Sequence, residues 1–173
     1  QGVLCVLKQF HYNIEEMLRD KAPLFLLLEN IQDPGNLGTM LRTGEGAGVS
    51  GIIMSRDTVD LYNPKVIRST MGSIYRVPFY YADDFAAAVH QVQQAGVSVY
   101  AAHLRGKNSY ACQDYTKGTA FLIGNEGNGL REETAELADC YIRIPMEGKV
   151  ESLNAAVASS ILMYEAHRQR ATI

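Results

Sequence analysis

The sequence predicts an α/β fold in which a parallel sheet carries helices on both of its faces. Short apolar runs rich in β-branched or aromatic residues alternate along the chain with helical patterns. Such alternation is typical of parallel strands, because neighbouring strands are joined by crossovers that are usually helices. The 173 residues, 47% of them hydrophobic, suffice for one domain with a sizeable core.

Six strands are expected from their apolar character, beginning with the buried run LFLLLEN. The expected strands are 24–30, 51–55, 77–81, 97–103, 119–124 and 141–145. Residues 1–21 precede the first of them and are expected to form a lead-in helix or linker. The α/β domain itself is expected to span residues 22–173.

Four helices are expected between and after the strands, at 37–48, 63–72, 83–96 and about 152–170. A DPG turn precedes Asn36, whose side-chain oxygen would cap the first helix. The second helix begins at Asn63, which is followed by proline. The third, DDFAAAVHQVQQAG, has acidic residues in its first turn and ends at Gly96.

Composition narrows the class of protein. The formal net charge of -3 argues against RNA binding by bulk electrostatics alone, so any RNA substrate needs a local patch or another domain. Cys5, Cys112 and Cys140 are far apart and lack metal-ligand spacing, so we expect buried or half-buried thiols in a reducing cytosol, with no metal site. No apolar stretch suggests a membrane partner, and a cytoplasmic location is expected. The chain begins at Gln1 rather than Met, as a fragment of a longer protein would.

The loops at the carboxyl ends of the strands are the expected ligand site, because ligands of open parallel sheets bind there. These loops are 30–37, 102–107, 124–131 and 145–152. His103, at the start of the second loop, is a candidate for this site, although a histidine at a strand end is more often structural.

The first unusual stretch is DPGNLGTMLRTGEGAG (33–48). A capping residue and a turn would explain Asn36 and the glycines without any ligand. Arg42 is harder to explain, since it lies among apolar residues of the expected helix, and a solvated surface arginine is the competing interpretation.

The second stretch is LIGNEGNGL (122–130), in which a strand runs directly into a loop of three glycines around Glu126. Glycines let a ligand approach the backbone closely, although a simple turn would also explain them. A dinucleotide fingerprint, and with it an NAD-dependent enzyme, is a poor match because the glycines do not fit the strand–GxGxxG–helix frame.

The third stretch is IPMEGKVESLNAAVASS (144–160). Ser152 is the expected cap of the last helix, and Asn154 would fall inside the first turn, where asparagine is unfavourable. The small residues that follow permit close approach of another segment. Leu153, Val157, Ile161 and Tyr164 would form the core-facing side.

In this order the three stretches resemble the signature motifs of the SpoU (TrmH-like) RNA 2′-O-ribose methyltransferases of the SPOUT superfamily, over roughly residues 22–170. The resemblance implies an α/β sheet whose C-terminal segment forms a deep trefoil knot, an S-adenosylmethionine cofactor, an rRNA or tRNA substrate and a homodimer. Many members also carry an N-terminal RNA-binding domain, which we expect to be absent from this chain.

The resemblance also assigns roles by position. The catalytic positions would be Arg42, Asn36, Glu126, Ser152 and Asn154. The cofactor-binding positions would be Gly124, Ile144 and Leu153, with Leu122 and Met146 nearby. His103 is added to the cofactor-binding set from its place at the end of a strand, not from the resemblance.

A guanidinium stays protonated in proteins, so we interpret Arg42 as a grip on phosphate and on the developing alkoxide rather than as a base, with Glu126 orienting it. The alternative is a catalytically silent RNA- or nucleotide-binding module on the same fold, for which the sequence offers no broken motif.

Overall fold

A computed structural model describes residues 2, 6 and 8–171 of the chain. In this part the strands form one seven-stranded sheet in the order β3-β2-β1-β6-β4-β7-β5, and every strand pair is parallel. The strands are β1 (Leu24–Leu28), β2 (Gly51–Ser55), β3 (Phe79–Ala82), β4 (Ser98–Ala102), β5 (Asn108–Ser109), β6 (Thr119–Ile123) and β7 (Cys140–Arg143). The α/β prediction is confirmed.

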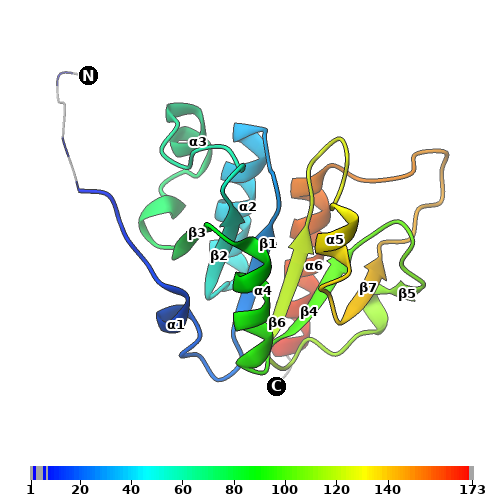
Figure 1. Ribbon diagram of the computed structural model, residues 1–173. Helices are drawn as coiled ribbons and strands as arrows, with labels where there is room; N and C mark the ends of the chain where they lie inside the picture. Colours follow the sequence, from blue (N-terminus) through cyan, green and yellow to red (C-terminus); the bar gives the residue numbers. More distant parts are fainter. Residues whose placement is uncertain (1, 3–5, 7, 172–173) are drawn as a thin grey trace.

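Helices cover both faces of the sheet, with α4 on one side and α2 and α6 on the other (Figure 1). The helices are α1 (Ile14–Met17), α2 (Pro34–Ala47), α3 (Pro64–Ser69), α4 (Phe85–Gln94), α5 (Glu132–Ala135) and α6 (Ala155–Ala171), with 3-10 turns η1 (Ser73–Tyr75) and η2 (Tyr110–Cys112). The expected strands and long helices are therefore present, with no end shifted by more than three residues. The short elements β5 and α5 were not predicted.

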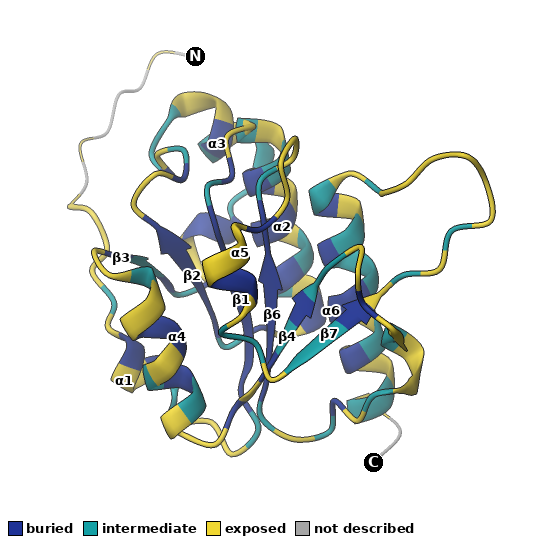
Figure 2. Cartoon of the chain, turned by 45° about the vertical axis from the view of Figure 1, so that its right-hand side comes forward, coloured by how far each residue is buried: buried dark blue, intermediate teal, exposed yellow. Residues whose placement is uncertain are grey.

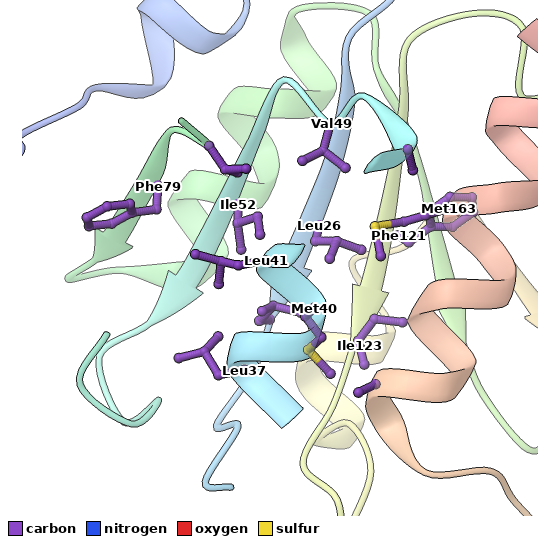
Figure 3. Packing of buried hydrophobic residues seen from close by; sticks show 14 of the residues in the cluster. Leu26, Leu37, Met40, Leu41, Val49, Ile52, Phe79, Phe121, Ile123 and Met163 are labelled. Atoms are coloured by element: carbon purple, nitrogen blue, oxygen red, sulfur yellow. The ribbon is translucent and has the colours of Figure 1, made fainter. Parts of the chain in front are cut away.

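Two hydrophobic clusters lie on opposite faces of the sheet because side chains alternate along each strand. Leu26 points into the cluster beneath α2 and α6, whereas its neighbour Phe25 points into the cluster beneath α4. Figure 3 shows the first cluster, in which Met40 of α2 and Met163 of α6 approach Phe121 of β6. The central strands are thus buried on both faces, as their uninterrupted apolar sequences predicted.

Helix α2 begins three residues earlier than predicted. Asp33, not Asn36, is its N-cap, since the Asp33 carboxylate accepts from the Asn36 backbone N–H at 2.7 Å. Pro34 occupies the first turn, where the missing N–H of proline costs nothing. The side chain of Asn36 is therefore available for other contacts.

Helix α6 begins later than predicted, at Ala155, and Ser152 does not cap it. The Asn154 side-chain oxygen accepts from the N–H groups of Ala156 (2.9 Å) and Val157 (3.2 Å), which is capping geometry. An asparagine that looked unfavourable inside a helix is thus favourable at its start.

The predicted core-facing side of α6 is wrong. Val157 is 48% exposed and Tyr164 is 49% exposed. The buried residues of this helix are Ala156, Ser159, Leu162, Met163 and Ala166. Small residues do allow close packing, as expected: the Ser160 hydroxyl donates to the Thr43 hydroxyl of α2 at 3.3 Å.

The end of α6 is fastened to the amino-terminal edge of the sheet by the side chain of Arg170, which acts beside that of Gln169. The Arg170 guanidinium donates to the carbonyl groups of Ala22 (2.7 Å), Tyr115 (2.8 Å) and Lys117 (2.7 Å). These carbonyls belong to the segments that enter β1 and β6, so Arg170 joins three distant parts of the chain.

Two of the expected buried or half-buried cysteines can be placed. Cys140 is half-buried, as expected, but Cys112 is exposed. The third, Cys5, lies outside the described residues. The exposure of Cys112 follows from its place in the short turn η2, which contributes no buried residue.

Candidate functional site

A cavity of about 260 Å³ opens at the carboxyl edge of the sheet, where ligands of this class of fold bind. Its walls come from three loops, which follow β4, β6 and β7. The third loop projects from the body of the molecule before returning to α6 (Figure 2). Seven residues predicted for the site line the cavity: His103, Gly124, Glu126, Ile144, Met146, Ser152 and Leu153.

Leu122 is the exception among the residues expected at the cofactor. It is fully buried in the cluster beneath α4, on the opposite face from α6. Its neighbour Ile123 points to the other face and lines the cavity. The alternation of side chains along β6 explains why the residue one position later has this place.

Position 124 requires glycine because the neighbouring backbone of the same chain leaves no room for a side chain. A Cβ atom at this position would lie 2.2 Å from the backbone carbon of Gly129 and 2.2 Å from the backbone nitrogen of Leu130. The loop folds back here, and Asn125 and Gly129 exchange backbone hydrogen bonds of 3.0 and 2.9 Å. Collision with a cofactor is therefore not needed to explain this glycine.

The loop after β6 is held in one conformation by Asn125. Its side-chain oxygen accepts from the N–H groups of Gly127 (2.9 Å) and Asn128 (3.1 Å), and its amide nitrogen donates to the Asn30 carbonyl (2.8 Å). Sequence reasoning missed this role, although an asparagine between two glycines is a common signal for a turn closed by its side chain.

Glu29 also holds the loop after β6 in place, a role that was not predicted from the sequence. Only 1% of Glu29 is exposed, and its carboxylate accepts from the Arg131 backbone N–H (2.8 Å) and the Thr134 hydroxyl (2.5 Å). The Arg131 guanidinium lies 3.6 Å from the same carboxylate and neutralises it. The visible signal was a single acid at the end of an otherwise apolar strand.

Glu126 connects the loop after β6 to the start of α2. Its carboxylate accepts from the backbone N–H groups of Gln32 (3.1 Å) and Asp33 (3.0 Å) and from the Asn36 side-chain amide (3.1 Å). Burial alone would raise the pKa of Glu126, but the hydrogen bonds from Asn36 and from these backbone groups lower the pKa below its ordinary value.

A continuous chain of hydrogen bonds joins all three unusual stretches. Asn154 accepts from helix N–H groups through its oxygen, so its amide nitrogen donates, and it does so to the Asn36 oxygen at 3.0 Å. The amide nitrogen of Asn36 then donates to Glu126. Each amide has its direction fixed by the next group, which makes the order Asn154 to Asn36 to Glu126 unambiguous.

Arg42 does not join this chain. Its side chain is exposed, about two turns into α2, and it makes no hydrogen bond or ion pair with any residue that the structure describes. The expectation that Glu126 orients Arg42 is wrong within one protomer, because both carboxylate oxygens of Glu126 are occupied by the residues around 32–36.

His103 is held at the rim of the cavity in one tautomer. Its Nδ1 atom accepts from the Arg105 backbone N–H at 3.1 Å, so the neutral ring carries its proton on Nε2. Burial lowers the pKa of His103, the charge of Arg105 lowers it further, and Glu132 opposes both. The ring lies 5.0 Å from that of Tyr141, measured between centroids. His103 is thus a neutral hydrogen-bond donor at neutral pH.

The described part of the chain has neither a metal site nor a membrane-spanning helix. No group of three or more His, Cys, Asp or Glu residues there has the arrangement of a metal site. Nor does that part contain a helix with the length and apolar character needed to span a bilayer.

Comparison with known proteins agrees with this geometry. A 23S rRNA (guanosine(2553)-2′-O)-methyltransferase, RlmP of Bacillus subtilis, is 37% identical over 139 residues, which cover 80% of this chain and 56% of that protein. The chain thus spans little more than half the length of this relative.

Solved structures match as well. The SpoU methyltransferase AviRb from Streptomyces viridochromogenes, in complex with the cofactor AdoMet, superposes with a TM-score of 0.85 at 31% identity, covering 92% of this chain and 62% of that one. An AdoMet-bound rRNA methyltransferase from Sinorhizobium meliloti superposes with a TM-score of 0.79 at 39% identity, covering 86% and 57%. Residues 23–164 match the sequence model of one family, described as the SpoU rRNA methylases. This chain belongs to the SpoU rRNA methylase family.

Proposed function

We propose that this chain transfers a methyl group from S-adenosylmethionine to a ribose 2′-OH of rRNA or tRNA. The observation that carries the proposal is the hydrogen-bond chain from Asn154 through Asn36 to Glu126, because it unites the three motifs beside one cavity. Residues 22–173 would form the catalytic domain, and residues 1–21 would lead into it. An rRNA or tRNA substrate also favours a cytoplasmic location.

The cavity suits the proposed cofactor. Apolar side chains such as Ile144 and Leu153 alternate in its walls with backbone groups of the glycine-rich loop, a combination that suits a nucleoside with a short polar chain. Ile144, Met146 and Leu153 would pack against the bound cofactor, and the His103 Nε2–H would offer it a donor. When bound, the cofactor supplies a methyl group already activated by its sulfonium.

The protein must then align the 2′-OH with that methyl group and assist loss of the proton. Alignment of two bound groups contributes several kcal/mol to a reaction of this kind, on the order of 7 or more in favourable cases. Asn36 and Asn154 have fixed directions and can hold a nucleotide in one orientation. The Glu126 carboxylate accepts from four donors and has a lowered pKa, so it acts as an anchor rather than as a base.

Arg42 is assigned to the phosphate and to the developing alkoxide. An exposed guanidinium without a partner among the described residues is available to make the paired hydrogen bonds that phosphate favours. It would stabilise negative charge on the 2′-oxygen as the proton leaves through phosphate or water. Ser152, exposed at the rim of the cavity, would contact the same nucleotide.

Substitution of Arg42 tests this assignment. We expect Arg42→Ala to bind S-adenosylhomocysteine with wild-type affinity, by calorimetry, and to lose methyl transfer. Arg42→Lys keeps the charge but not the paired geometry, so its activity should stay far below wild type. Near-full activity in Arg42→Lys would refute the paired contact. If the wild type binds the cofactor but transfers no methyl group to rRNA or tRNA, only the alternative of a catalytically silent binding module would remain.

We also infer a two-fold homodimer. Val157 and Tyr164 expose apolar surface on one side of α6, next to the α2 helix that carries Arg42. A partner subunit covering this side would bury both residues. Light scattering at micromolar concentration checks this, and a monomeric mass would count against it.

We also propose the C-terminal trefoil knot that the family resemblance implies. The chain leaves β7, on the far side of β4, and returns so that α6 packs beside β6 and α2. This return path passes the loops after β4 and β6, which line the same cavity. A C-terminal segment threaded through those loops is consistent with that path.

A further inference from the structure

A second, smaller cavity of about 120 Å³ lies against the loop after β6. Four residues line both cavities: Asn125, Asn128, Gly129 and Leu130. The small cavity is completed by Glu29, Asn30 and Arg131, so five of its seven lining residues have polar side chains. The tip of this loop therefore separates two cavities.

Asn128 differs from the other polar side chains of this loop. Asn125 uses both ends of its amide, and Glu126 uses both carboxylate oxygens. Arg131 is paired with Glu29 and Asp57. The side chain of Asn128 makes no hydrogen bond with any residue that the structure describes, although its backbone N–H is held by Asn125 at 3.1 Å.

This combination is what recognition of a planar polar group requires. The backbone of Asn128 is fixed, so little ordering is needed on binding, and its amide offers two donors and an acceptor. An amide can therefore form two hydrogen bonds with the edge of a nucleobase. Unstacked bases of single-stranded RNA present such edges to proteins.

The proposed reaction brings a nucleobase close to Asn128. The ribose whose 2′-OH is methylated must lie at the mouth of the large cavity, and its base is attached to the same ribose. We propose that Asn128 reads the base of the target nucleotide, whose edge enters the small cavity, and thereby determines which nucleotide is methylated. This inference rests on the proposed methyl transfer.

The test compares Asn128→Asp and Asn128→Ala with wild type. Asn128→Asp keeps the shape but removes both donors, and Asn128→Ala removes donors and acceptor. Gln94→Ala is a matched control, because Gln94 is an exposed side-chain amide at the end of α4, near the opposite edge of the sheet. The probes are unmodified transcripts of 16S and 23S rRNA and of tRNAs, with methyl-labelled S-adenosylmethionine, and the four labelled 2′-O-methyl nucleosides are separated after digestion.

We expect kcat/KM for the preferred nucleoside to fall about 10- to 100-fold in both Asn128 variants, the effect of losing one two-bond contact to a base. Asn128→Ala should spread the label over more of the four nucleosides. Affinity for S-adenosylhomocysteine and the melting temperature should match wild type and Gln94→Ala.

Three other results would overturn the inference. An unchanged distribution and rate would show that Asn128 does not read the base. A tenfold weaker affinity for S-adenosylhomocysteine would make Asn128 a cofactor contact instead. Absence of transfer by wild type would refute the proposed function itself, and this inference with it.

Discussion

Replacing Asn36 with aspartate changes one link of the hydrogen-bond chain and leaves the others. A carboxylate at position 36 can still accept from the Asn154 amide, but it cannot donate to Glu126. Two carboxylate oxygens would then face each other across the present 3.1 Å contact. The variant therefore isolates the contact between the first and second motifs.

The size of the effect follows from that distance. Two unit charges 3.1 Å apart repel by about 5 kcal/mol at the effective dielectric constant of a protein surface and by about 1.3 kcal/mol in water. Glu126 is exposed and Asn36 is half-buried, so a value near the lower limit applies. The amino terminus of α2 offsets some tenths of a kcal/mol of this repulsion, because its partial positive charge stabilises the new carboxylate. We expect the free energy of unfolding to fall by about 2 kcal/mol at pH 8, equivalent to about 30-fold in an equilibrium constant.

The loss should depend on pH. Repulsion raises the folded-state pKa of the carboxylate pair above its unfolded value, so the penalty is present above the raised pKa and vanishes as protonation removes one charge. In the wild type, the folded-state pKa of Glu126 lies below its unfolded value of about 4.5. Glu126 therefore stabilises the folded protein above pH 4.5, and this stabilisation is still present at pH 5. The difference between variant and wild type should therefore shrink between pH 8 and pH 5.

Urea unfolding and methyl transfer, each measured as a ratio to wild type across this pH range, provide the assay. Asn36→Ala is the control, because it loses the same donor without adding a charge, and its deficit should not vary with pH. Parallel profiles for the two variants would refute the electrostatic reasoning.

Two further predictions concern stability and use urea unfolding. Gly124→Ala should lower the free energy of unfolding by about 3 kcal/mol or more and abolish cofactor binding, because its Cβ would meet the Gly129 backbone. Gly127→Ala, the control, should lower it by about 1 kcal/mol or less. Equal losses in the two variants would contradict the steric account. Arg170→Met should lose about 3 kcal/mol with its carbonyl contacts. Arg168→Met, which breaks an ion pair between an exposed guanidinium and the half-buried Glu165 of the preceding turn, should change stability by about 1 kcal/mol or less. An Arg170→Met variant as stable as Arg168→Met would show that the fastening of α6 is unimportant.

Local patterns in the sequence predicted local structure well. The alternation of apolar runs and helical patterns is a consequence of burial, and burial acts on every residue of a central strand. Capping was less predictable, because Asp33 and Asn36 are equally suitable caps and only the position of Pro34 in the first turn separates them. The face of α6 was misjudged because Ala156 and Ser159, being small, were not recognised as the buried side.

The strand order and the contacts of the site were beyond local patterns. Nothing in the sequence of β6 indicates that it lies between β1 and β4. The bond between Asn36 and Asn154 joins residues 118 positions apart. The resemblance named both residues, but it did not say that they touch, nor that Glu126 binds the residues around Asn36 rather than Arg42.

The bond between Asn36 and Asn154 also means that the proposed site is completed late in synthesis. A chain emerging from the ribosome folds from its amino-terminal end, and β1, α2 and β2 can begin to associate early. The Asn36 oxygen meets its Asn154 partner only when α6, the last of the described elements, has docked. A nascent or truncated chain that lacks residues 155–171 would thus present Arg42 and the loop after β6 without the completed hydrogen-bond chain, and under the proposed function we expect it not to methylate RNA.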